Sequence, residues 1–127
     1  MLVQVPISVG ELLDKITILE IKVGCFGNGP KLANVQAELG RLTAVCAQDG
    51  ITCDGADFEA LRQVNRDLWD VEDRIRAMEF AQDFGAEFVA LARSVYRMND
   101  RRFEVKRRLN ERWGSALIEE KSYQQYQ

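Results

Sequence analysis

The chain has 127 residues, with 17 Lys and Arg against 20 Asp and Glu, and a formal net charge of −3 at pH 7. This length suits one domain, here residues 1–127, because a second hydrophobic core needs a longer chain. Histidine is absent, which removes the commonest general base and metal ligand and excludes Ser-His-Asp and Cys-His nucleophiles. We therefore expect no metal site and no cofactor.

The cysteines and the N-terminus indicate the cellular compartment in which the protein works. Cys25, Cys46 and Cys53 are odd in number and widely spaced, and unpaired thiols are typical of the reducing cytoplasm. The N-terminus has no basic region before an apolar run and no apolar stretch of membrane-spanning length. These features predict a cytoplasmic protein without a membrane partner.

Helical periodicity dominates the chain, and turn residues separate its periodic segments. The leading LVQV alternates like a strand, but no other segment offers it a partner. We expect it to be extended or to pair with a second copy in a homodimer. Ser8 and Glu11 form a capping box for a first helix at about residues 9–23. The segment GCFGNGP ends that helix, because three glycines and a proline disfavour its continuation.

Three further helices follow. The second is expected at about residues 32–48, and the third at about residues 58–81 with Asp57 as its N-cap. The fourth spans about residues 86–113 and ends at Gly114, a residue type that suits the C′ position. Short connections favour antiparallel neighbours. The predicted fold is all-α, an antiparallel bundle of four main helices with a short extended N-terminus. The C-terminal tail adds a short helix or runs along the bundle.

Charge is divided between the last two predicted helices. Residues 57–83 hold eight acids against four arginines, and residues 93–112 hold eight bases against three acids. Helices of opposite sign attract each other, so pairing within the bundle explains much of this pattern. The basic segment DRRFEVKRR suggests a nucleic-acid interface, but the chain is net acidic and has no recognisable nucleic-acid motif. We therefore do not expect nucleic acid as a partner.

Polar residues interrupt the apolar faces of three predicted helices when positions are placed at about 100° per residue. Asn99, Arg102 and Lys106 lie within the stripe of the fourth helix. Glu20 lies on the apolar side of the first helix, and Asp14 lies on the opposite, polar side. The polar and aromatic residues directed toward the shared interior are the candidate ligand-binding residues: Glu20, Asn65, Trp69, Glu72, Arg76, Asn99, Arg102 and Lys106.

The charges of this set indicate a ligand class. A buried charge without a partner costs several kcal/mol, so Glu20 and Glu72 are the expected counter-charges of the three cations. The surplus cation is typical of a pocket that holds a phosphate or carboxylate with an arginine fork. Trp69, Tyr96 and Phe103 are candidates for its floor. Each residue alone has the simpler interpretation of an ion pair or a solvated edge, and a purely structural network would produce the same pattern.

A carboxylate cluster on the third predicted helix has two interpretations. Asp70 and Asp73 with Glu72 resemble a magnesium site. Both aspartates, however, fall on the polar side of that helix, which favours a solvated face.

Four blocks of the sequence carry a family resemblance. They are ISVGELLDKITILEIK, VNRDLWDVEDRIR, ALARSVYRMNDRRFEVKRRLN and GSALIEEKSY, and they extend over nearly the whole chain. Together they resemble a family of short bacterial and phage proteins of unknown function. The resemblance implies a setting in surface-polysaccharide biosynthesis and no catalytic assignment. The chain departs from the family at VGCFGNGP, where relatives look more helical, so its first helix is expected to be shorter.

Three functions fit these observations. We expect a small binding or accessory protein that recognises an anionic metabolite, or a partner protein, through its polar interior and its tail. The first alternative is an all-α enzyme that acts on an anionic small molecule through Arg, Lys and Glu electrostatics, without a nucleophile. The second alternative is a purely structural dimer.

Overall fold

The computed structural model describes residues 1–126, and within them it shows four helices and no strand, so the predicted all-α fold is confirmed. Residues 1–7 are extended, as one of the two predictions for LVQV requires, and the residues that follow α4 form a tail without a helix. None of the helices is long and apolar enough to cross a lipid bilayer. The helices are α1 (Val9–Cys25), α2 (Pro30–Gln48), α3 (Ala56–Phe80) and α4 (Ala86–Arg112).

Helix ends follow the sequence signals with one exception. The Ser8 hydroxyl accepts a hydrogen bond of 3.1 Å from the Glu11 backbone N–H, which caps α1 as predicted. α1 ends at Cys25, two residues later than the expected end at Val23, and its length relative to other family members stays a prediction. The predicted N-cap of α3 is wrong: Gly55, at φ +93°, takes that position because glycine adopts positive φ without steric cost, and Asp57 lies in the first turn. Gly114, at φ +61°, follows α4 as predicted.

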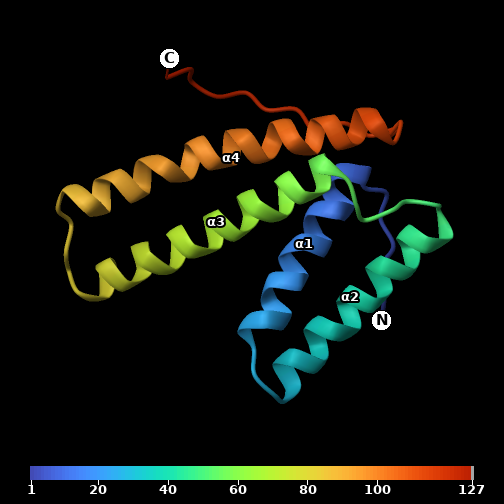
Figure 1. The fold of residues 1–127 in the computed structure, drawn as a ribbon, viewed down its shortest axis with the longest axis horizontal. Coiled ribbons are helices and arrows are strands. Elements are labelled where there is room, and N and C mark those ends of the chain that lie inside the picture. Colours follow the sequence, from blue (N-terminus) through green and yellow to red (C-terminus); the bar gives the residue numbers. More distant parts are fainter. Residues whose placement is uncertain (127) are drawn as a thin grey trace.

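The four helices form two antiparallel hairpins, α1 with α2 and α3 with α4. α1 contacts all three other helices, whereas α2 contacts only α1. Figure 1 shows the hairpins meeting near the start of α1 and the C-terminal part of α4, and diverging from there. The distal half of the α3/α4 hairpin therefore stands away from α1 and α2.

The hydrophobic core lies where the two hairpins meet. Leu13, Phe58, Leu61 and Leu109 are completely buried there, and Cys46 joins them from α2. Burying each large side chain contributes about 1.5–3 kcal/mol relative to its exposed state, which makes this junction the main source of stability. The backbone at this junction is therefore firmly held, and so are the side chains that point from it into the space between the two hairpins.

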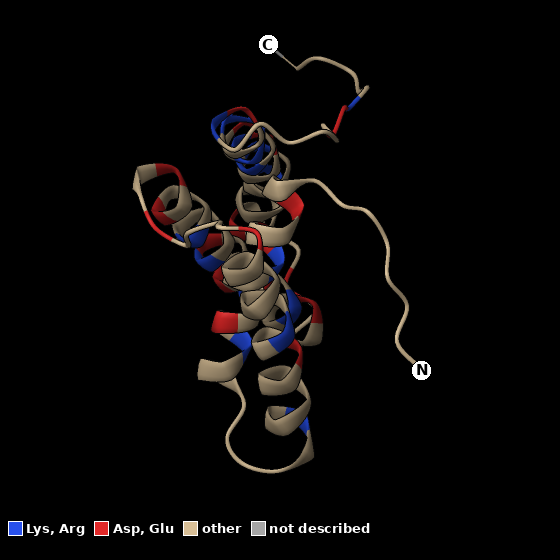
Figure 2. Cartoon of the chain, turned by 90° about the vertical axis from the view of Figure 1, so that its right-hand side faces the viewer, with Lys and Arg blue, Asp and Glu red and all other residues tan. Residues whose placement is uncertain are grey.

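The C-terminal tail runs back along α4. Its first residue, Ser115, accepts a hydrogen bond of 3.1 Å from the Val9 backbone N–H at the start of α1. Near its end, the Tyr126 hydroxyl donates to Asp100 on α4 at 2.6 Å. The tail therefore follows the bundle, which was one of its two predicted forms. Figure 2 shows both extended termini on the same side of the helices.

Candidate functional site between the two hairpins

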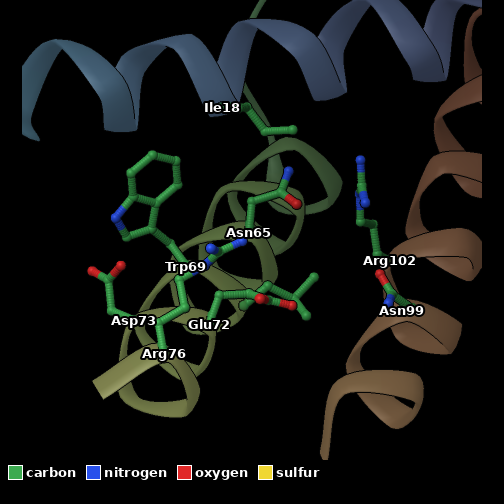
Figure 3. Close-up of a pocket in the computed structure, with 9 residues that line it drawn as sticks. Ile18, Asn65, Trp69, Glu72, Asp73, Arg76, Asn99 and Arg102 are labelled. Carbon is green, nitrogen blue, oxygen red and sulfur yellow. The ribbon is translucent and has the colours of Figure 1, made fainter. Parts of the chain in front are cut away.

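A cavity of about 660 Å³ lies in the angle between α1 and the α3/α4 hairpin. The structure brings six of the eight candidate residues together in its lining. Figure 3 shows them projecting from α3 and α4 beneath α1. Ile18, Leu68 and Asp73 complete the lining. The six candidates are Asn65, Trp69, Glu72, Arg76, Asn99 and Arg102.

Asp14 is the residue at this site that the sequence pattern missed. Its side chain is only 1% exposed, although the pattern placed it on the polar side of α1. Its Oδ1 accepts hydrogen bonds from Asn65 Nδ2 at 2.8 Å and from Arg102 Nε at 2.9 Å, and its Oδ2 accepts from Arg102 Nη2 at 2.5 Å. The prediction failed because α1 packs against three helices, so its second side is covered as well.

Among the described residues, the Arg102 guanidinium forms hydrogen bonds to the protein along only one of its edges. Asp14 takes the edge formed by Nε and Nη2. The hydrogen bond to Asp14 raises the pKa of Arg102 above its ordinary value, against the opposing effect of burial. The Nη1 group donates no hydrogen bond within residues 1–126. Because Arg102 lines the cavity, its second fork is available to a planar anionic group.

Asn65 supplies an acceptor of fixed orientation. Its amide nitrogen donates to Asp14 and to Thr17 Oγ1, each at 2.8 Å, which uses both amide protons. Its side-chain oxygen accepts no hydrogen bond from the described part of the chain. Asn65 is 5% exposed. Figure 3 shows the nitrogen facing α1 and the oxygen turned toward the side of Arg102, so this oxygen can accept from a ligand.

The rim of the cavity comes from α3. Trp69 is half-buried and offers an aromatic face, whereas Glu72, Asp73 and Arg76 are exposed. No ion pair involves these three charged residues within residues 1–126. Asp73 is solvated, as predicted, yet it also lines the cavity. Arg102 and the rim together carry two positive and two negative charges, so the predicted surplus cation is wrong for this cavity.

Two candidate residues lie outside the main cavity. Glu20 accepts from Arg62 Nε at 3.0 Å and from Nη2 at 3.4 Å on the outer edge of the α1–α3 contact. Lys106 is 6% exposed and lies in a neighbouring smaller cavity, where its Nζ donates to Glu11 Oε2 at 2.9 Å and lies 3.0 Å from Glu119 Oε1. Burial lowers the pKa of Lys106, but its bonds to Glu11 and Glu119 outweigh burial and leave that pKa above its ordinary value.

The predicted counter-charges are therefore corrected. Glu20 and Glu72 were expected to neutralise the cations of α4. Instead, Asp14 pairs with Arg102, and carboxylates from the start of α1 and from the tail pair with Lys106. The helical pattern could not anticipate a tail residue, because the path of an extended segment leaves no periodic signal.

The remaining sequence candidates have other positions. Tyr96 and Phe103 line other cavities, in which α4 faces the tail, so they do not floor the main cavity. Within residues 1–126, no group of three or more Cys, Asp or Glu side chains is arranged to hold a metal ion.

Comparison with known proteins places the chain in a family and gives no function. No characterised protein and no solved structure shows significant similarity to it. A family model matches residues 3–126, which include both hairpins, the cavity and nearly all of the tail. The resemblance seen in the four sequence blocks is thus confirmed, and the chain belongs to the family of unknown function DUF6165.

Proposed function

We propose that the chain is a small binding or accessory protein whose inter-hairpin cavity receives an anionic small molecule. The observation that carries this proposal is the state of Arg102. Buried Asp14 holds one edge of its guanidinium, Nη1 donates no hydrogen bond within residues 1–126, and the residue lines the cavity. A preorganised fork binds carboxylate or phosphate oxygens without the entropy cost of ordering a flexible side chain.

The charged residues around the cavity narrow the ligand class. Asp14 neutralises Arg102, and Glu72 with Asp73 adds two carboxylates near the opening. A second anionic group placed beside Glu72 and Asp73 would be repelled by these carboxylates. A ligand that combines one acidic group with several hydrogen-bond donors fits better. Its hydroxyls can donate to the Asn65 carbonyl and to these carboxylates, and its less polar face can lie against Trp69.

Phosphorylated or acidic sugars meet this description, because they join an anionic group to several hydroxyls. The proposal therefore includes the setting in surface-polysaccharide biosynthesis that the family resemblance implies. A partner protein that carries an equivalent acidic, hydroxyl-rich group would use the same contacts.

Calorimetric titration with glucose 1-phosphate tests the proposal through two matched variants. Arg102→Lys keeps a cation beside Asp14 but removes the second fork, and we expect affinity to fall at least about tenfold. Arg101→Lys, one residue earlier and exposed on α4, should bind like wild type. Equal affinity in the two variants, or no binding by the wild-type protein, would reject the proposal. If the Asp14→Leu, Arg102→Leu double variant is more stable and no ligand shifts the wild-type melting temperature, the network is structural.

A further inference from the structure

A second, smaller cavity adjoins the proposed site. It has a volume of about 260 Å³ and shares Asn99 and Arg102 with the main cavity. The buried ammonium group of Lys106 lies in its wall. Arg102 and Lys106 are one helical turn apart on α4, so their side chains leave the helix roughly 5–6 Å from each other. The two adjoining cavities therefore place two cations, Arg102 and Lys106, next to each other on one face of α4.

The tail already places an anionic group at Lys106. Glu119 Oε1 lies 3.0 Å from Lys106 Nζ, and this oxygen is buried. Although the two groups form an ion pair, Glu119 Oε1 accepts no well-directed hydrogen bond within residues 1–126. Lys106 has a better-directed bond to Glu11, at 2.9 Å. The Glu119 carboxylate thus occupies the Lys106 cavity without satisfying all of its own hydrogen-bonding capacity.

Other contacts hold this part of the tail weakly. Glu120 lies 3.7 Å from Arg107, and both side chains are largely exposed. The Lys121 ammonium lies 5.3 Å from the centre of the Phe103 ring. Exposed ion pairs contribute little to stability, because water and salt screen them. A competing anion therefore needs to replace mainly the contact between Glu119 and Lys106.

We propose that Lys106 is a second anion subsite, occupied in this structure by the tail's own Glu119, and that a ligand with two acidic groups binds Arg102 and Lys106 together and displaces the tail. This inference rests on the proposed function of the main cavity. It narrows the ligand to compounds that carry two neighbouring acidic groups, such as diphosphates and short dicarboxylates. Binding also frees the segment around Glu119 from α4, while Tyr126 keeps its hydrogen bond to Asp100 farther along the tail.

Inorganic pyrophosphate is the probe, with sulfate at equal ionic strength as the reference anion. Because Glu119 competes with the ligand, Glu119→Gln should increase pyrophosphate affinity roughly fivefold, as the loss of one partly exposed ion pair allows. Glu120→Gln is the matched control: it removes the same charge from the neighbouring tail position without touching Lys106. Equal affinities in the two variants would overturn the inference.

Release of the tail gives a second readout. Trypsin cleavage after Lys121, followed by mass spectrometry, should accelerate when pyrophosphate is added to the wild-type protein. It should not accelerate in Lys106→Met, whose helical content is checked by circular dichroism. If pyrophosphate binds in an Arg102-dependent manner but neither Glu119→Gln nor cleavage responds, the second subsite is rejected and the main cavity stands. If pyrophosphate binds neither the wild type nor Glu119→Gln, and glucose 1-phosphate also fails to bind, both proposals fail.

Discussion

Asp14 on α1 and Arg102 on α4 are joined by two hydrogen bonds, from Arg102 Nε to Oδ1 at 2.9 Å and from Nη2 to Oδ2 at 2.5 Å. Asn65 on α3 donates to the same carboxylate. One buried acid therefore links three helices at the edge of the core, and it also orients the two side chains that face the cavity. The stability of the fold and the ligand binding that we propose should therefore both depend on this contact.

Asp14→Asn should destabilise the protein by about 3 kcal/mol, because it leaves a largely buried guanidinium without a counter-charge. Urea unfolding followed by circular dichroism measures the free energy change. Asp70→Asn is the control, since Asp70 is exposed on α3 and its side chain makes no hydrogen bond within residues 1–126. That variant should stay within about 0.5 kcal/mol of wild type. A similar small loss for Asp14→Asn would mean that the buried ion pair contributes little.

Gly10→Ala should cost about 2 kcal/mol or more, because α1 and α4 approach closely at this glycine. A Cβ atom there would lie 2.6 Å from the Lys106 carbonyl oxygen and 2.9 Å from Asn110 Oδ1. That Asn110 oxygen also accepts from the Gly10 backbone N–H at 2.6 Å, so the contact cannot simply open.

Gly40→Ala is the opposite case and serves as the control for Gly10→Ala. A Cβ at Gly40, inside α2, would meet nothing within 4 Å. Alanine there should stabilise the protein by about 0.5–1 kcal/mol through helix propensity. Thermal unfolding of both variants checks the pair, and the expectation is wrong if both shift the melting temperature in the same direction.

Alkaline pH should weaken the fold through Cys46. Burial, with smaller contributions from the Cys53 thiol and Asp49, raises the pKa of Cys46 from 9.0 to about 12. Between those values the unfolded chain loses a thiol proton that the folded chain keeps. The free energy of unfolding therefore falls as pH rises above 9, by at most about 1.4 kcal/mol per pH unit from this group.

Urea unfolding of Cys46→Ala between pH 8 and 10.5, under reducing conditions, measures this contribution. The variant should lose less stability than wild type over the range, whatever its stability at pH 8. Cys25→Ala is the matched control, because Cys25 is exposed. Parallel pH profiles for wild type and Cys46→Ala would contradict the assignment.

Glu20→Gln should leave anion binding unchanged, because Glu20 pairs with Arg62 outside the cavity. Both side chains are more than a third exposed, so the loss of stability should stay below about 1 kcal/mol. Arg62 also keeps its contact with Glu59. The glucose 1-phosphate titration that is applied to Arg102→Lys checks this variant. A tenfold loss of affinity would place Glu20 in the site.

Local signals predicted the helices well, because those signals act within a few residues. The cap at Ser8 and the glycine at position 114 mark helix ends through hydrogen bonds and backbone conformation that need no tertiary partner. Periodicity also identified the faces of α3 and α4, so that Asn65, Trp69 and Arg102 were correctly assigned to one cavity. Gly55 replaced Asp57 as an N-cap because the loop before α3 needs a positive φ, which composition alone does not reveal.

The sequence by itself determined that the chain is all-α, where most of its helices end and which polar residues of α3 and α4 face the cavity. The tertiary structure decided how their charges are paired. α1 is covered by three helices, so Asp14 becomes buried although a helical wheel assigns it to solvent. Glu119 reaches Lys106 through an extended tail that has no periodicity. Partner choice depends on distances between segments far apart in the chain, and a local pattern contains no information on those distances.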